Sequence, residues 1–174
     1  MKLGIIGIQG SGKGTQAKLI AKEFKLKRVS IGKILRDEIA SKSRRGKILK
    51  KYVDKGLLAP NRIVNELILK NLPRDNFIVD GFPRDKKQLN LAKRVGFDKI
   101  ILLTLLKKEV YKRIRKRRKL EGREDDAQKA LDERLKIFYE QSPKIIKFFG
   151  KKISRINGNQ SVKKVFGDVK KRLK

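Results

Sequence analysis

Residues 7–13 (GIQGSGK) constrain this chain more than any other stretch of its sequence. They follow an apolar run at residues 3–8 and precede a helical pattern, which is the setting that a Walker A phosphate loop requires. Glycines adopt positive φ at little cost, so successive backbone N–H groups can turn inward around phosphate oxygens. The N-terminus of the following helix adds partial positive charge, and Lys13 is placed to reach the β and γ phosphates. The segment therefore predicts a site for a nucleoside triphosphate.

Apolar, β-branched runs elsewhere in the chain predict further buried strands. With the first run they lie at residues 3–8, 77–79, 100–106 and 153–156, and a short fifth piece lies at 28–30. Helical periodicity separates them, with apolar residues at i, i+3, i+4 and i+7 from Ala17 to Phe24 and from Val162 to Val169. Strands alternating with helices predict an α/β fold of the P-loop NTPase type, in which five parallel strands are flanked by helices.

Two stretches interrupt this pattern and look like insertions: the basic helical region 31–59 and the polar segment 118–126. A long helical pattern runs from about residue 125 to 148, and Pro143 must kink or split it. The 174 residues suit one domain. No apolar run approaches the roughly 18 residues of a membrane span, and the N-terminus lacks the pattern of a signal peptide. We therefore expect a cytoplasmic protein that does not enter the membrane.

The charge of the chain is unusual, because 49 Lys and Arg residues against 18 Asp and Glu residues leave a net +31. Such a field attracts polyanions and steers anionic ligands, so it fits a nucleic-acid binder and an enzyme with phosphorylated substrates equally well. The sequence contains neither Cys nor His, which excludes disulfides, zinc sites and imidazole acid–base chemistry. The chemistry must come from Lys, Arg, carboxylates, hydroxyls and backbone amides.

Residues 80–84 (DGFPR) follow a predicted strand, and Gln88 stands four positions after Arg84. These residues match, without a change and at the expected spacing, the signature of the adenylate kinase family of nucleoside monophosphate kinases, which the sequence resembles. The remaining matches are residues 13–16 (KGTQ), 31–36 (IGKILR), 52–58 (YVDKGLL), 123–126 (REDD) and Arg134. The resemblance covers essentially the whole chain.

The resemblance implies reversible phosphoryl transfer from ATP to AMP, giving two ADP, with Mg²⁺ as cofactor. It divides a single kinase domain into a core (1–29, 60–117 and 127–174), a lobe for the monophosphate (30–59) and a short lid (about 118–126). Lobe and lid are expected to close over the nucleotides and exclude water. The lid is too short for the zinc-bearing hairpin of longer relatives. We expect a monomer.

The resemblance also implies a role for each matched residue. ATP would contact Gly10, Ser11, Gly12, Lys13, Gly14, Thr15, Arg113, Arg117 and Gln160. AMP would contact Ile31, Arg36, Leu58, Gly81, Arg84, Gln88, Arg123 and Arg134. The catalytic cations would be Lys13, Arg84, Arg117, Arg123 and Arg134, and Mg²⁺ would be held by Asp80 through water and by Thr15.

Phosphoryl transfer needs positioning and positive charge more than covalent chemistry, so an arginine-rich site without His is adequate. Arg suits bidentate phosphate contact. A carboxamide at Gln88 offers a donor and an acceptor together, which matches N6 and N1 of adenine. Family members specific for pyrimidines tend to carry Asn there, so Gln88 favours AMP.

Two residues depart from the family pattern. Ile31 stands where the family has a Thr that touches AMP, and Lys33 stands where an Asp orders the Mg²⁺ waters. Binding of Mg²⁺ should then depend more strongly on Asp80 and Thr15, unless Lys33 contacts phosphate directly. Lower activity or a broader acceptor preference would follow.

Two alternative functions stay open. One is a kinase for UMP or CMP. The other is a basic, RNA-associated P-loop NTPase, supported by the basic stretches 42–51, 107–119 and 163–174. Aromatic residues make up only 6% of the chain, which leaves few platforms for stacking bases. We therefore expect nucleic-acid binding that is non-specific and sensitive to salt.

Overall fold

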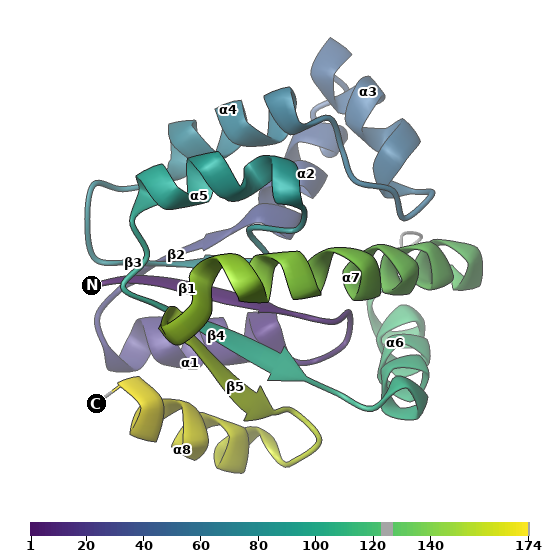
Figure 1. Cartoon of the computed structure of the whole chain (residues 1–174). Helices are drawn as coiled ribbons and strands as arrows, with labels where there is room; N and C mark the ends of the chain where they lie inside the picture. Colours follow the sequence, from purple (N-terminus) through teal and green to yellow (C-terminus); the bar gives the residue numbers. More distant parts are fainter. Residues whose placement is uncertain (123–126, 174) are drawn as a thin grey trace.

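A parallel β-sheet forms the centre of the computed structural model, which describes residues 1–122 and 127–173 (Figure 1). Its five strands are β1 (Lys2–Gly7), β2 (Lys27–Ser30), β3 (Phe77–Asp80), β4 (Lys99–Thr104) and β5 (Ile153–Asn157). Every neighbouring pair is parallel, in the order β2-β3-β1-β4-β5. The predicted five-stranded parallel sheet is confirmed.

Eight α-helices among the described residues connect and cover the strands. They are α1 (Lys13–Glu23), α2 (Ile31–Ala40), α3 (Arg44–Val53), α4 (Asn61–Asn71), α5 (Leu89–Val95), α6 (Lys107–Glu121), α7 (Gln128–Phe149) and α8 (Val162–Leu173). Short 3₁₀ turns, η1 (Lys86–Gln88) and η3 (Gly150–Lys152), precede α5 and follow α7. Figure 1 shows α1 and α8 on one side of the sheet and α4, α5 and α7 on the other.

The three central strands β1, β3 and β4 are buried on both faces, which explains why they are nearly continuous apolar runs. In β4, Ile101 and Leu103 point into a core shared with α1 and α8. The alternate residues Ile100 and Leu102 point into the opposite core, shared with α2, α4, α5 and α7. Because side chains alternate along a strand, one apolar run serves both cores.

The order of the strands places the phosphate loop at the centre of the sheet's carboxyl edge. From β1 the chain builds β2 and β3 on one side and β4 and β5 on the other, so the winding reverses at β1. Ligands bind at such a reversal, outside the carboxyl ends of the strands. The loop that follows Gly7 therefore opens into this crevice.

Two of the predicted boundaries are corrected by the structure. The strand predicted at 100–106 ends at Thr104, because Leu105 packs against a separate apolar cluster that includes Ile8 and Val110. Pro143 was expected to kink or split its helix, and the split is wrong, because α7 is one helix from Gln128 to Phe149. No helix in the part of the chain that the structure describes is long and apolar enough to span a membrane.

Candidate functional site

The phosphate loop has the backbone geometry that its glycines predict. Gly10 and Gly12 have φ values of +76° and +90°, in the region that favours glycine. The Ser11 N–H donates to the Ile8 carbonyl at 3.2 Å, which closes the turn, and α1 begins at Lys13. The N-terminus of α1 therefore faces the crevice at the edge of the sheet, as an anion site requires.

Lys13 lies across this loop and is electrostatically unusual. Its Nζ donates to the carbonyl oxygens of Gly7 and Ile8 at 2.9 and 2.8 Å. Burial lowers the pKa of Lys13 from its ordinary 10.5 to about 7. The Asp80 carboxylate opposes this shift, and the cations of Arg84, Arg117 and Arg134 add to it. Polyanionic phosphates would restore the full positive charge of Lys13.

A cleft of about 900 Å³ lies over the phosphate loop. It brings together the described residues that the sequence predicts for ATP: Gly10, Ser11, Gly12, Lys13, Gly14, Thr15, Arg113, Arg117 and Gln160. Arg113 is held by Glu109 at 3.0 Å and by the Gly158 carbonyl at 3.1 Å, which ties α6 to the loop after β5. Lys33, which departs from the family pattern, lines the same cleft and pairs with Asp37 on its own helix.

Asp80, predicted as the metal residue, carries an ion pair in this cleft. It closes β3 with only 8% of its surface exposed, and its Oδ2 lies 2.9 Å from Nη2 of Arg28 and 3.4 Å from Oγ of Ser30. Arg28 has a buried Nε that finds no hydrogen-bond partner among the described residues. Sequence reasoning missed Arg28, although it lies two residues before Ser30 on the same face of β2.

The donor set around Asp80 fits a Mg²⁺ ion that the nucleotide carries. Among the described residues, no group of three or more carboxylates could hold a metal ion. Asp80 is the only acidic residue among the described residues that line the cleft, where the Thr15 hydroxyl also lies. Mg²⁺ keeps several waters and is often bound by one or two carboxylates plus substrate phosphates, which matches this arrangement.

A second, smaller cavity of about 60 Å³ gathers the residues predicted for the acceptor. Its lining includes Ile31, Arg36, Leu58, Gly81, Arg84, Gln88 and Arg134. Ile31 is 3% exposed and packs in the main apolar core, so it contributes shape and no hydrogen bond. Arg84 is anchored through its Nε to the Gly81 carbonyl at 3.0 Å, and Arg134 through Nη2 to the Val53 carbonyl at 3.0 Å.

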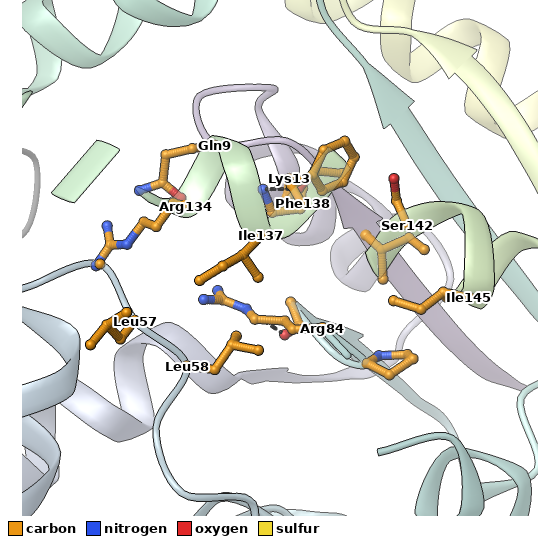
Figure 2. Close-up of a pocket in the computed structure, with 15 residues that line it drawn as sticks. Gln9, Lys13, Leu57, Leu58, Arg84, Arg134, Ile137, Phe138, Ser142 and Ile145 are labelled. Carbon is orange, nitrogen blue, oxygen red and sulfur yellow. Dashed lines mark hydrogen bonds between the residues drawn. The ribbon is translucent and has the colours of Figure 1, made fainter. Parts of the chain in front are cut away.

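A third small pocket, drawn in Figure 2, shares Gln9 and Arg84 with both cavities and is also lined by Lys13 and Arg134. Ile137 and Phe138 of α7 supply apolar wall, with Leu57 and Leu58 from the loop after α3. Gln9, missed from the sequence although it lies inside the loop motif, joins the cations here. With its carboxamide oxygen turned toward them, it accepts from Nη2 of Arg117 and Nη1 of Arg134, both at 3.0 Å.

One predicted catalytic residue, Arg123, lies outside the described residues, as do Asp125 and Asp126. All the other predicted site residues line the cleft over the phosphate loop or the acceptor cavity. Arg84 lines both, as do Gln9, Gly32 and Arg36, so the donor and acceptor sites are adjacent at these residues.

Comparison with known proteins agrees with this geometry. A model of the family described as adenylate kinase matches residues 5–154. The adenylate kinase of Parabacteroides distasonis is 34% identical, in an alignment that covers 95% of this chain and 94% of that protein. That of Azobacteroides pseudotrichonymphae is 35% identical, with 99% and 97% covered. Adenylate kinase isoenzyme 1 of Sus scrofa is 32% identical, with 95% and 90% covered. The family match and these nearly full-length similarities show that the chain belongs to the adenylate kinase family of nucleoside monophosphate kinases.

Proposed function

We propose that this protein transfers the γ-phosphoryl group of ATP reversibly to AMP, forming two ADP. The observation that carries the proposal is that Arg84 lines both cavities. A triphosphate over the phosphate loop and a monophosphate beside Gln88 would both reach this guanidinium. Transfer between them requires an in-line arrangement and positive charge around the moving group.

The cations that line the donor cleft and the acceptor cavity would have separate roles. Lys13 lies on the phosphate loop and would contact the β and γ phosphates of the donor. Arg84 and Arg36 line the acceptor cavity and would hold the α-phosphate of AMP. Arg117 and Arg134, which share the Gln9 oxygen, would exchange that oxygen for those of the transferring group. Because phosphoryl oxygens carry developing charge, such preorganised donors lower the barrier.

Mg²⁺ would be held by the nucleotide phosphates, with its water ligands ordered by Asp80 and with Thr15 close by. When bound, it would neutralise negative charge on the phosphates. Asp80 also places a negative charge near Lys13, where it favours the protonated amine.

The lobe 30–59 and the lid at about 118–126 would close over the substrates. The lobe contains α2, α3 and the following loop, whose Leu57 and Leu58 line the pocket drawn in Figure 2. Arg134 on α7 already contacts this lobe at the Val53 carbonyl. Closure would exclude water, which otherwise competes with AMP as acceptor.

A coupled assay of ADP formation tests the proposal. With ATP as donor and saturating Mg²⁺, we expect AMP to be a better acceptor than CMP, UMP or GMP. Lys13→Ala should reduce kcat by at least about 100-fold, the scale on which a single electrostatic donor contributes. UMP or CMP as the best acceptor would assign the protein to pyrimidine nucleotides. Undiminished activity of Lys13→Ala would place the reaction at another site.

The net charge of +31 supports a second, weaker expectation, that the protein binds nucleic acids without sequence preference. Counterion release makes such binding fall steeply with salt. Retention on single-stranded RNA should therefore disappear by about 300 mM NaCl. Tight binding that survives this salt would favour an RNA-associated function.

A further inference from the structure

A directional chain of hydrogen bonds runs through Gln88 in the acceptor cavity. The Arg84 backbone N–H donates to Gln88 Oε1 at 2.8 Å, and Gln88 Nε2 donates to Asn61 Oδ1 at 2.8 Å. Asn61 Nδ2 in turn donates to Asp85 Oδ2 at 3.0 Å, and the other Asp85 oxygen accepts from the Gln88 backbone N–H at 3.1 Å. Gln88 is 3% exposed and Asp85 is 6% exposed.

The two ends of this chain determine the orientation of both carboxamides between them. A backbone N–H can only donate, and a carboxylate can only accept. Turning Gln88 over would set its NH₂ against the Arg84 N–H and its oxygen against the Asn61 oxygen. Turning Asn61 over would set its oxygen against the Asp85 carboxylate. Each reversal leaves buried polar groups unpaired, which is the costly outcome for a hydrogen-bonding group.

We propose that Asn61 and Asp85 are positioning residues that set the base preference of the acceptor site by holding Gln88 in one orientation. This rests on the proposed function, in which Gln88 contacts the acceptor base. After its internal bonds, the carboxamide keeps one acceptor position on its oxygen and one N–H on its nitrogen. Adenine offers the matching order, an amino group at C6 and an acceptor at N1.

Hypoxanthine distinguishes this mechanism from simple packing, because it is nearly the same size as adenine and reverses both groups. Its C6 carries a carbonyl oxygen, and its N1 carries a hydrogen. Gln88 held in the observed orientation meets acceptor with acceptor and donor with donor when IMP replaces AMP. A site built to hydrogen-bond a substrate group rejects analogues that leave its buried polar groups unpaired.

The sharpest test exchanges the two side chains that set the direction. In Asp85→Asn, the Gln88 backbone N–H retains the remaining oxygen at position 85, so the new NH₂ faces Asn61. The Asn61 carboxamide must then reverse, which places its own NH₂ against Gln88 Nε2. Gln88 cannot reverse in turn, because its oxygen accepts from the Arg84 N–H on the other side. The double variant Asn61→Asp/Asp85→Asn removes the conflict, because a carboxylate at position 61 accepts from both neighbours.

We expect Asp85→Asn to lower the ratio of kcat/KM for AMP over IMP by about tenfold, the upper range for one net hydrogen bond. The change should lie in KM for the monophosphate and leave KM for ATP unaltered. Asn61→Ala should lower the ratio by about fivefold, since only the Arg84 N–H then orients Gln88. The double variant should return to within about twofold of the wild-type ratio, as coupled neighbours do in a double-mutant cycle.

Asn71→Ala is the matched control, because Asn71 lies on the same helix as Asn61 and, among the described residues, its side chain donates only to the Leu67 carbonyl, at 2.8 Å. It should leave the ratio unchanged. Equilibrium binding of AMP and IMP to each variant measures the same base preference independently of catalysis. An unchanged ratio in Asp85→Asn, or a double variant no better than the single one, would overturn the inference. Failure of the wild type to use AMP would instead overturn the proposed function.

Discussion

Arg28 Nη2 lies 2.9 Å from Asp80 Oδ2, so the Asp80 carboxylate in the donor cleft already has a cationic partner. The pair packs against the phosphate loop, where a Cβ at Gly14 would lie 3.3 Å from Arg28 Nη2 and 3.5 Å from Asp80 Oδ2. A metal ion whose waters are ordered by Asp80 would share this carboxylate with the guanidinium. We therefore propose that Arg28 competes with Mg²⁺ for Asp80.

Replacing Arg28 should strengthen metal binding. We expect Arg28→Gln to raise the affinity of the protein–ADP complex for Mn²⁺ by about fivefold, in line with about 1 kcal/mol for a partly exposed ion pair. Electron paramagnetic resonance of free Mn²⁺ measures this directly, and the Mg²⁺ concentration for half-maximal ADP formation should fall with it. Arg74→Gln removes the same charge from an exposed loop before β3 and should have no effect. Weaker Mn²⁺ binding in Arg28→Gln would show that Arg28 supports the metal.

The low pKa of Lys13 makes the stability of the nucleotide-free, metal-free protein depend on pH. In the folded state Lys13 loses its proton near pH 7, and in the unfolded state near its ordinary 10.5. Between these values the unfolded chain binds more protons, so Lys13 makes the free energy of unfolding rise with pH in this window. Below about pH 7 both states are protonated and the contribution is flat.

Urea denaturation at several pH values isolates this effect. The wild type should gain stability relative to Lys13→Met between pH 7 and 10, and the two should run parallel below pH 6.5. A ¹³C-labelled lysine resonance that titrates near pH 7 and is absent from Lys13→Met would assign the group. Parallel curves over the whole range would show that Lys13 keeps an ordinary pKa.

Ile31 should trade stability against acceptor binding. Ile31→Thr places a hydroxyl in a site that is 3% exposed and removes buried apolar volume, so we expect a loss of about 1–3 kcal/mol in the free energy of unfolding. The hydroxyl faces the acceptor cavity and should lower KM for AMP several-fold. Ile31→Val is the control, because it loses one methylene and gains no donor. Equal KM values in the two variants would exclude a hydrogen bond at this position.

Gly56 is the glycine at which substitution should cost most. It has φ +76°, and an added Cβ would lie 2.1 Å from the Ala130 carbonyl oxygen of α7. We expect Gly56→Ala to destabilise the fold by more than about 2 kcal/mol, because backbone strain and a backbone clash coincide. Gly167→Ala in α8, where no described atom lies within 4 Å, should stabilise by about 1 kcal/mol. Thermal denaturation compares them, and similar midpoints would contradict the clash.

Local signals were strong enough to predict the sheet and the phosphate loop. The loop needs only a strand, several glycines, Lys13 and a helix, all within one continuous segment. The ends of elements were less predictable, since an apolar residue such as Leu105 can serve a strand or a neighbouring cluster. Pro143 was tolerated inside α7, which buries a face of the helix around it, including Ser142 and Ile145.

The candidate site shows the same contrast between what local sequence signals predict and what tertiary packing decides. The sequence by itself determined which residue types carry the chemistry: Lys13, the arginines and Asp80 stand in short motifs whose spacing is local. Only the tertiary structure decided how they are paired. Arg28 meets Asp80 because β2 pairs with β3, and Asn61 meets Gln88 because α4 packs beside η1. These partners are 52 and 27 residues apart, a separation at which packing of whole elements, and no local preference, brings two side chains into contact.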